Sequence, residues 1–506
     1  MPQQSKIYQS EVRYSFVFWS LVIIGIAFIA SSHPMLKLRF DIWQHIGNID
    51  ILVLDPDAKI ARSSWYATWA IFFRTFGIND IFTYAVIVHR VQFLLNCIII
   101  YYAAKLLFAA LLPIIELEDG SNKSGRKQWL SSLAMSSIFV WLTAIGTVST
   151  FQQAWIMWYS VNYQITLPLL FLALGLFVNA SSLKQNNTLI VIKLMSSLLL
   201  LALIYLYHAG ELAYLVFYLP ILLICFTTKK NYKKTLILIV MVLIVVLIAT
   251  KFYSDIVPEL IKLLKEGDWI EIKKRINTHG LYNIQGGNRY LANWNELYAL
   301  SVIMAIPVIF LGWTQRHHVN QRVLLFIILS LVFCFIPTFK YSAGVASLIS
   351  YDGIVNRYYF ASFIFVLIPL CLYLVLRYFK ILQHPVVLIA SVLILMGLVL
   401  SYSKLLNNDG VFYQNVKSIK NSLYQDRVGV EFSKFEIDSI GVQINAAHAQ
   451  YRSDQFIFCA NYDKAHIIYY VYRQKNIQFV RNPFYVTIDK CKYFADSNGL
   501  LAITIN

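Results

Sequence analysis

The chain has 506 residues, of which 58% are hydrophobic and only 14% are charged, and its mean hydropathy is +0.60. Soluble globular domains carry about 25% charged residues, so this composition excludes an ordinary soluble enzyme. The same apolar content excludes an intrinsically disordered chain. The net charge of +17 comes from Lys and Arg in short segments between apolar runs. We interpret it as a mark of membrane topology, since no nucleic-acid-binding motif accompanies it.

Apolar runs recur along the chain, about eleven in all, and each approaches the roughly 20 residues that a helix needs to cross a bilayer. The first run, 16–30, also resembles a signal peptide, but the many runs after it favour an uncleaved first helix. Further spans are expected near 82–112, 130–149, 161–178, 189–206, 212–226, 236–250, 297–313, 323–337, 360–376 and 385–401.

Basic residues concentrate in every second connection between these runs, on the side that also holds the N-terminus. They are Lys123, Arg126, Lys127, Lys184, Lys229, Lys230, Lys233, Lys234, Arg316, Arg322, Arg377 and Lys380. Cytoplasmic loops are enriched in Lys and Arg, so this side is expected to be cytoplasmic, and an odd number of spans places the C-terminus outside. The sequence therefore predicts a mainly α fold. Residues 1–402 would form a polytopic transmembrane bundle with long external segments at 31–80, 251–296 and 338–359.

The remaining segment, 403–506, mixes charged and apolar positions, and 456–488 is rich in the Ile, Val, Tyr and Phe that strands favour. We expect a small external α/β domain there. Cys459 and Cys491 both lie in this domain and predict a disulfide in an oxidising compartment. No metal-ligand spacing of Cys or His is present in the sequence.

Scarce acidic residues gather after the first span, in RFDIWQHIGNIDILVLDPD (39–57). Asp41 comes first, and His45 follows four residues later, on the same face if the segment is helical. A carboxylate at the outer membrane surface can act as a general base on a substrate hydroxyl. The simpler interpretation is a solvated polar loop over about 31–64.

An amphipathic helix is expected at 64–77, lying on the membrane surface. Its aromatic side would comprise Trp65, Trp69 and Phe72. His89 and Arg90 fall near the outer part of the second span. Arg90 is expected either to pair with an acid of the first external segment or to reach the membrane interface.

Three further groups could contact a substrate. His208 and Glu211 lie between adjacent spans at an outer turn, where ionisable residues often mark functional sites, although a short polar turn explains them equally well. Arg357 enters a span from outside at headgroup level and, with Lys340, could hold a phosphate. The third group follows the turn at Gly286–Gly287 and offers stacking and hydrogen-bonding groups for a sugar, or an ordinary interface belt. It comprises Arg289, Tyr290 and Trp294.

This architecture resembles that of the integral-membrane glycosyltransferases of the GT-C fold. The resemblance rests on a cytoplasmic N-terminus, a first span, an early Asp in RFDIWQHIGNID and an amphipathic surface helix. Length, about eleven spans and an external C-terminal domain are most similar to the serotype-converting O-antigen glucosyltransferases (Gtr type) of enteric bacteria and their phages. Many GT-C enzymes carry two adjacent acids in the first loop, whereas Asp41 stands alone until Asp50, which leaves the participation of a divalent metal open.

The resemblance implies a donor sugar, glucose by analogy, carried on undecaprenyl phosphate at the periplasmic face of the bacterial inner membrane. The acceptor would be a hydroxyl of O-antigen or a related lipid-linked glycan. Asp41 would be the base of an inverting single displacement, without an organic cofactor. Arg357, Lys340 and Arg289 would bind the donor phosphate. The substrate-binding residues would be Trp43, His45, Asp50, His208, Glu211, Tyr290 and Trp294.

Two other functions fit the composition. A polymerase or ligase of lipid-linked glycans would use similar external arginines, but it would not need the acid after the first span. A transporter or flippase would place ionisable groups near the middle of the membrane and would show paired helix breaks. The sequence gathers its ionisable groups at the outer surface, which favours glycosyl transfer.

Overall fold

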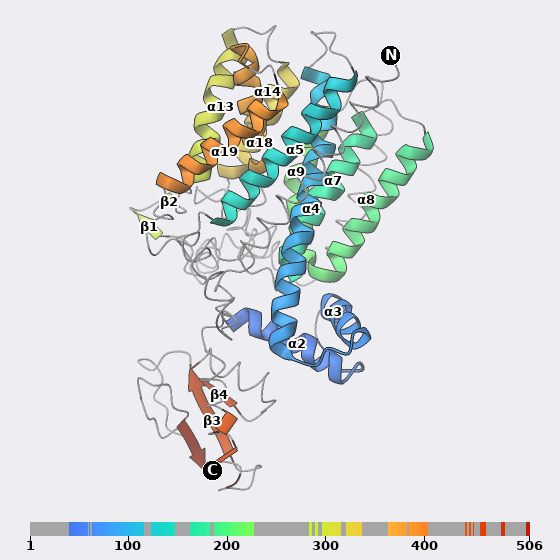
Figure 1. The fold of residues 1–506 in the computed structure, drawn as a ribbon, viewed down its shortest axis with the longest axis vertical. Coiled ribbons are helices and arrows are strands. Elements are labelled where there is room, and N and C mark those ends of the chain that lie inside the picture. The colour runs from blue at the N-terminus through green and yellow to red at the C-terminus, as the bar shows by residue number, and fades with distance from the viewer. Residues whose placement is uncertain are drawn as a thin grey trace, which may run out of the picture. The chain divides into compact units, whose positions relative to one another are not determined.

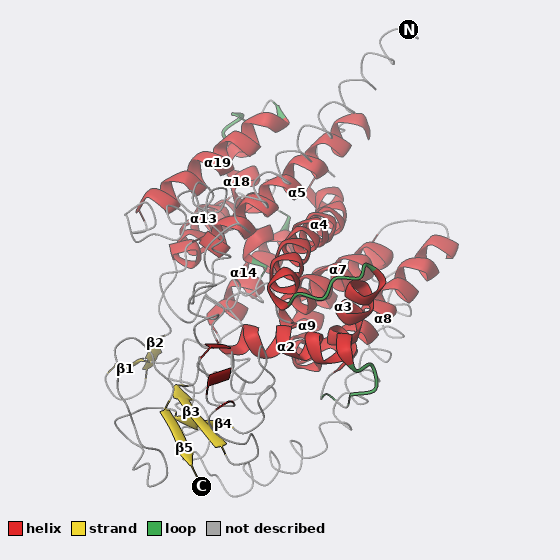
Figure 2. Ribbon diagram, turned by 60° about the horizontal axis from the view of Figure 1, so that its bottom comes forward, coloured by secondary structure: helices red, strands yellow, loops and turns green. Residues whose placement is uncertain are grey.

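The computed structural model describes a set of separate ranges of the chain. They are residues 40–58, 60, 63–115, 123–146, 162–182, 187–226, 283–285, 289–291, 296–314, 320–335, 363–381, 384–402, 441–442, 445–446, 449, 456–461, 477–480 and 502–505. Helices dominate these ranges, and Figure 2 shows that strands form only small sheets. The expected mainly α fold is therefore confirmed.

The chain divides into two compact units (Figure 1). Unit 1 comprises Met1–Trp19, Leu95–Trp155 and Ile165–Val411. Unit 2 comprises Ser20–Leu94, Ile156–Gln164 and Phe412–Asn506. Helix α4, Ile81–Ile115, begins in unit 2 and continues into unit 1.

Two short helices precede α4 in unit 2: α2, Phe40–Leu54, and α3, Ser63–Thr75. They pack against each other. In α2 the buried residues Ile46, Ile49 and Val53 recur at i, i+3 and i+7, which gives the helix one apolar face. This spacing explains why part of the stretch expected to be a polar loop is helical.

The sequence marks the boundary between α3 and α4 clearly. Gly77 has a φ of 64° and ends α3, because the Ile78 amide donates to the Phe73 carbonyl and the Gly77 amide to the Arg74 carbonyl. Asp80 then caps α4. Its Oδ2 accepts the Thr83 amide at 2.9 Å, which satisfies a donor that the first turn would otherwise leave without a partner.

Unit 1 consists mainly of helices that pack on one another. They are α5 (Lys123–Gly146), α7 (Asn162–Ser182), α8 (Asn187–His208), the 3₁₀ turn η2 (Ala209–Tyr214), α9 (Leu215–Phe226), α13 (Glu296–Thr314), α14 (Gln321–Phe335), α18 (Ile364–Tyr378) and α19 (Pro385–Tyr402). α5 packs on α18 and α19, α13 packs on α14 and α18, and α9 packs on α14.

Buried aromatic rings form the centre of unit 1. The ring of Phe171 on α7 lies 4.7 Å from that of Phe365 on α18, measured between centroids. The ring of Tyr218 on α9 lies 4.7 Å from that of Phe363 and 5.0 Å from that of Phe333 on α14. Tilted ring pairs at these distances add to the stability given by burial alone. This cluster joins four helices that are far apart in the sequence.

Helices α4, α7 and α8 are joined by close packing and by polar contacts. The Cα of Gly175 on α7 faces the backbone of Ala103 on α4 so closely that a methyl group there would lie 3.1 Å from the carbonyl oxygen. Asn179 accepts a hydrogen bond from Lys193 of α8 at 2.6 Å. The Ser197 hydroxyl donates to the Ala173 carbonyl at 2.8 Å. Polar contacts of this kind fix the rotation of one apolar helix against another.

Strands occur in two places. β1 (Asn283–Gln285) and β2 (Arg289–Leu291) form an antiparallel pair in which Ile284 faces Tyr290. β3 (Phe456–Asn461), β4 (Ile477–Val480) and β5 (Ala502–Ile505) form a sheet of order β4-β3-β5, with β3 parallel to β4 and antiparallel to β5. The strand-rich composition of 456–488 thus predicted β3 and β4, whereas β5 lies beyond that segment.

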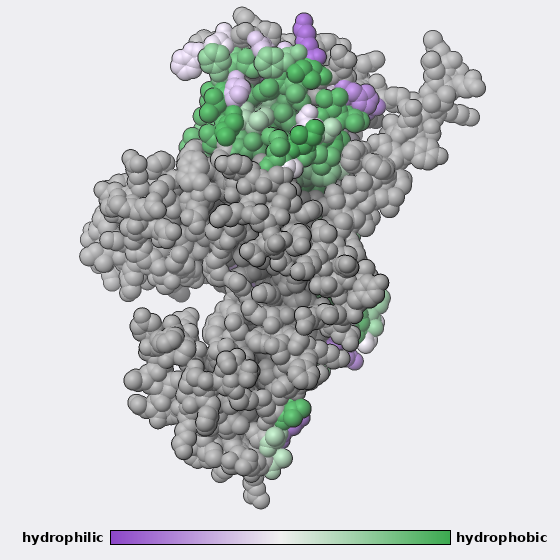
Figure 3. Space-filling view, turned by 60° about the vertical axis from the view of Figure 1, so that its left-hand side comes forward, coloured by the Kyte–Doolittle hydropathy of each residue, from purple (hydrophilic) through white to green (hydrophobic). Residues whose placement is uncertain are grey.

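Large apolar side chains are exposed along several helices of unit 1. On α13 and α19 they are Ile303, Ile306, Phe310, Trp313, Val386, Leu393, Ile394 and Leu398. Figure 3 shows the corresponding face, on which apolar residues form a broad surface with hydrophilic residues along one end. By length and composition, two helices in the described ranges could cross a membrane, Thr83–Leu112 within α4 and the whole of α8. Six other helices contain shorter apolar stretches.

Most of the predicted spans are helices with nearly the expected bounds. The largest difference is at α5, which begins at Lys123 rather than at 130, because the basic residues before the apolar run are good helix formers. The predicted runs 16–30 and 236–250 lie outside the described residues.

The contact between α4 and α7 gives a first prediction. Gly175→Ala should lower the thermal unfolding midpoint in detergent, because overpacking of a helix contact costs about 1–3 kcal/mol. Gly397→Ala is the matched control. It is also in a helix interior, but no atom lies within 4 Å of the added methyl group, so it should be neutral or slightly stabilising. Equal shifts for the two variants would contradict a tight α4–α7 contact.

Candidate functional site

The expected general base lies on a helix. Asp41 is in the first turn of α2, and His45 is one turn later, so the two positions share a face as the sequence predicted. Asp50 is nine residues after Asp41, about half a turn round the helix, and therefore lies on the opposite face. It is buried, with 5% of its surface exposed. A single face of α2 thus cannot present both acids, and Asp50 is not a neighbour of Asp41 on this helix.

The imidazole of His45 is held by aromatic residues of α3. The Tyr66 hydroxyl and His45 Nδ1 are 2.7 Å apart, a hydrogen bond whose direction depends on the His45 tautomer. The Trp65 ring contacts the imidazole edge-on, with 6.1 Å between centroids. Trp65 and Tyr66 are both buried. Such contacts restrict the rotation of the imidazole and keep it in one orientation relative to α2.

Trp65 connects this cluster to α4. Its indole Nε1 donates to Gln92 Oε1 at 3.1 Å, and Gln92 is fully buried. One side chain of α3 therefore contacts a residue of α2 and a residue of α4. We call His45, Trp65, Tyr66 and Gln92 the α2–α4 cluster.

Helix α4 carries a buried polar stripe. His89, Gln92 and Asn96 lie at i, i+3 and i+7, on one face, and each is at most 4% exposed. Buried polar residues in a long apolar helix are costly and are usually kept for a functional or packing reason. His89 is buried inside the protein, and its depth in a membrane and the alternatives for Arg90 remain predictions.

A second group lies at the junction of α8 and α9 in unit 1. His208 is the last residue of α8, and Glu211 lies in η2. His208 Nδ1 and Glu211 Oε2 are 2.6 Å apart, and the Glu211 side chain is only 2% exposed. A buried carboxylate that accepts an imidazole N–H fixes the tautomer and the orientation of the ring. The two residues predicted to act together are therefore in direct contact.

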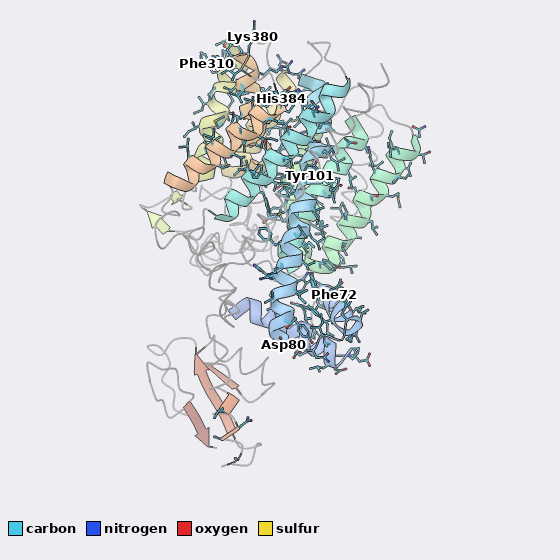
Figure 4. All side chains as sticks on the ribbon, in the orientation of Figure 1. Phe72, Asp80, Tyr101, Phe310, Lys380 and His384 are labelled. Atoms are coloured by element: carbon cyan, nitrogen blue, oxygen red, sulfur yellow. The ribbon has the colours of Figure 1, made fainter. Side chains whose placement is uncertain are left out.

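The aromatic side of α3 does not face outward as expected. Trp65 and Trp69 are buried within unit 2, where Trp69 stacks on Phe73 with 5.9 Å between centroids. Of the three predicted residues only Phe72, labelled in Figure 4, is exposed. The reason is that α2 packs against α3 and takes up the apolar face that the sequence offers to a membrane.

The remaining predicted residues are described in part or lie outside the described ranges. Five have a described backbone only: Asp41 and Trp43 in α2, Arg289 and Tyr290 in β2, and Cys459 in β3. Four lie outside the described residues: Lys340, Arg357, Trp294 and Cys491. The proposed disulfide and the phosphate site therefore stay predictions.

The structure brings predicted residues together in two separate groups, His45 with the α2–α4 cluster and His208 with Glu211. Sequence analysis did not single out Tyr66, Gln92 or Asn96. The i, i+3, i+7 spacing of His89, Gln92 and Asn96 in an apolar run was a signal that could have identified the stripe. Within the described ranges, no three His, Cys, Asp or Glu side chains are placed to hold a metal ion.

Comparison of the chain with models of protein families, with curated proteins and with solved structures gave no match.

The His45–Tyr66 contact predicts a spectroscopic change. Tyr66→Phe should shift the ¹⁵N resonances of the His45 imidazole, because the hydroxyl that selects its tautomer is lost. The resonance is identified by its absence in His45→Gln. Tyr84→Phe is the control, since the Tyr84 hydroxyl donates to the Ile78 carbonyl. Both variants should lose roughly 1 kcal/mol of stability. The same shift in both would mean a general structural effect.

Proposed function

We propose that this chain is an integral-membrane glycosyltransferase. It moves a sugar from a polyprenyl-phosphate donor to a hydroxyl of O-antigen or a related lipid-linked glycan on the periplasmic face of a bacterial inner membrane. The first support for the proposal is the amino-acid composition, whose long apolar runs are suited to a membrane environment. Exposed apolar faces on α8, α13 and α19 support that environment.

The proposed architecture is a polytopic bundle of about eleven spans, followed by a small α/β domain at 403–506. The apolar helices of unit 1, which pack on one another, support the bundle, and the sheet β4-β3-β5 supports the external domain. Its parallel pair β3–β4 needs a crossover connection, and helices commonly supply one. With the basic connections in the cytoplasm, the η2 turn lies at the periplasmic end of the bundle.

The observation that carries the proposed chemistry is the shared face of Asp41 and His45 on α2. An acid directly after the first span lies within one helical turn of an imidazole that Tyr66 holds in place. Side chains in a solvated loop are not held in one orientation in this way, because no neighbouring residues restrict their rotation. A base must be positioned against the hydroxyl that it activates, and a helix gives a more precise position than a loop.

The reaction is an inverting displacement. The Asp41 carboxylate takes the proton from the acceptor hydroxyl while that oxygen forms a bond to the anomeric carbon of the donor sugar. The bond between the anomeric carbon and the phosphate oxygen breaks at the same time, and its electron pair leaves with the polyprenyl phosphate. Arg357, Lys340 and Arg289 would stabilise the negative charge that develops on this leaving group.

Other residues would bind the sugars rather than take part in the bond changes. His45 would hydrogen-bond a sugar hydroxyl from a fixed ring orientation. Trp43, Tyr290 and Trp294 offer aromatic faces for stacking on a pyranose. His208 and Glu211 would bind the substrate at the outer end of unit 1. Asp50 lies on the face of α2 opposite to Asp41. It would support the site through the packing of α2 and would not contact the hydroxyl that loses its proton.

A second candidate function is the transport of a lipid-linked glycan. The buried stripe His89–Gln92–Asn96 on α4 favours it, because polar side chains on the interior of a spanning helix mark substrate paths. A polymerase or ligase would share the external arginines with the glycosyltransferase but would not depend on Asp41. The two experiments below separate these functions.

Asp41→Asn should abolish transfer without unfolding the protein, because an amide cannot accept the proton. The loss of a general base predicts a fall in kcat of roughly 100- to 10,000-fold. The assay supplies purified protein in detergent with polyprenyl-phosphate glucose and an O-antigen acceptor. Asp57→Asn, an exposed acid of the same segment, is the control and should keep normal activity. Full activity in Asp41→Asn would refute the assignment of the base.

Arg357→Ala should mainly raise the KM for the donor, since the guanidinium would contact its phosphate before and during the reaction. The measurement is donor-dependent kinetics at a fixed acceptor concentration. An unchanged donor KM would remove Arg357 from the site. If wild-type protein transfers none of several sugars but moves a fluorescent lipid-linked glycan across reconstituted vesicles, the chain is a transporter.

A further inference from the structure

Lys380, in the turn between α18 and α19, has an unusual backbone conformation. Its φ is 57°, and it is the only non-glycine residue with a positive φ among the residues described. The left-handed region costs a residue with a Cβ about 1 kcal/mol or more, and a lysine has no local side-chain bond to offset that cost. Glycine or asparagine would take this conformation at a lower cost than lysine.

The same turn occurs elsewhere in the chain with a glycine. At the end of α3, Gly77 occupies the left-handed position between the bonds Ile78 N to Phe73 O and Gly77 N to Arg74 O. At the end of α18, the corresponding bonds are Ile381 N to Leu376 O and Lys380 N to Arg377 O. Glycine is the usual residue in this motif. The second copy therefore carries a lysine where glycine would cap the helix without strain.

Other basic groups lie beside Lys380. Arg377 is in the last turn of α18, and His384 precedes α19. His384 Nδ1 accepts the Val386 amide at 3.3 Å, so the ring proton is on Nε2, which can donate outward. Cations near a helix C-terminus are favoured by the helix dipole, and this accounts for Arg377. It does not account for a strained Lys380, and the sequence from 353 to 408 contains no Asp or Glu to pair with it.

Exposed apolar side chains flank the basic ones. Phe379 and Ile381 are each more than half exposed, and Trp313 in the last turn of α13 is 78% exposed. Figure 4 shows Lys380, His384 and Phe310 at the same end of unit 1. Aromatic residues beside basic residues at the ends of apolar helices are typical of the level of lipid headgroups. The surroundings thus combine positive charge with side chains suited to acyl chains.

We propose that Arg377, Lys380 and His384 form a binding site for the headgroup phosphate of an anionic membrane lipid. The guanidinium and the ammonium hold the phosphate oxygens through charge-assisted hydrogen bonds, and His384 Nε2–H adds a third donor. Phe379 and Ile381 contact the upper part of the acyl chains.

This inference depends on the proposed membrane location but not on glycosyl transfer. It also fits the proposed topology, in which the connections rich in Lys and Arg face the anionic cytoplasmic leaflet. The site would lie at the end of the bundle opposite to His208 and Glu211. Its test therefore uses lipid binding and stability, and neither readout changes if the catalytic assignment fails.

The experiment titrates phosphatidylglycerol or phosphatidylcholine into the full-length protein in detergent, with bound lipid counted by native mass spectrometry. Lys380→Asn removes the charge and keeps a residue that tolerates the left-handed region. It should weaken phosphatidylglycerol binding about fivefold, the effect of one basic residue near an anionic surface. Phosphatidylcholine should bind equally weakly to both proteins. Arg74→Gln, which removes an exposed arginine from unit 2, is the control and should bind like wild type.

Lys380→Gly is a second test, in which the stability without lipid should rise and the stabilisation by lipid should fall. It should raise the thermal midpoint in lipid-free detergent by a few degrees, because glycine relieves the strain. It should also lose the extra stabilisation that phosphatidylglycerol gives to the wild type. Inorganic phosphate at the same concentration should give no such stabilisation. The proposal is overturned if Lys380→Asn binds phosphatidylglycerol like wild type, if Arg74→Gln loses as much affinity, or if inorganic phosphate replaces the lipid.

Discussion

The bond from the Trp65 indole to Gln92 is the interaction on which the organisation of unit 2 depends. Through it, α3 is attached to the first half of α4, and the same indole ring contacts His45 of α2. Removal of this contact would take the Trp65 N–H away from the oxygen of a fully buried amide, and the loss of a donor at a buried acceptor costs more than the bond itself contributes. The α2–α4 cluster therefore links the stability of three helices to the orientation of the imidazole next to Asp41.

The apolar periodicity of the sequence was sufficient to predict the long helices. α4, α8, α13 and α19 begin and end close to the predicted bounds, because long apolar runs are among the most reliable signals for a helix. The short helix α2 was interpreted as a polar loop, since its acids obscured the i, i+3, i+7 pattern of Ile46, Ile49 and Val53. That pattern spans only about two turns of helix, and it becomes decisive only when α3 covers it.

Side-chain partners were harder to predict than helices. His208 and Glu211 are three residues apart, so the sequence alone placed them together. The partner of His45 is Tyr66, 21 residues away on another helix, and no local spacing reports a contact of that kind. The burial of Trp65 and Trp69 was missed for the same reason, because an amphipathic face is equally suited to lipid and to a neighbouring helix. Only the packing of α2 on α3 decides between the two.

The attachment of α8 to α7 has a consequence for how such a chain is made. α8 exposes most of its apolar surface, including Leu199 at 72%, and it meets α7 through the bonds Lys193–Asn179 and Ser197–Ala173. In lipid, apolar contact alone gives little preference for one helix rotation over another. In the membrane location that we propose, the two bonds would give the α7–α8 hairpin a fixed internal register once both helices are in the bilayer. The hairpin would then be a preformed unit of biogenesis, onto which later helices assemble.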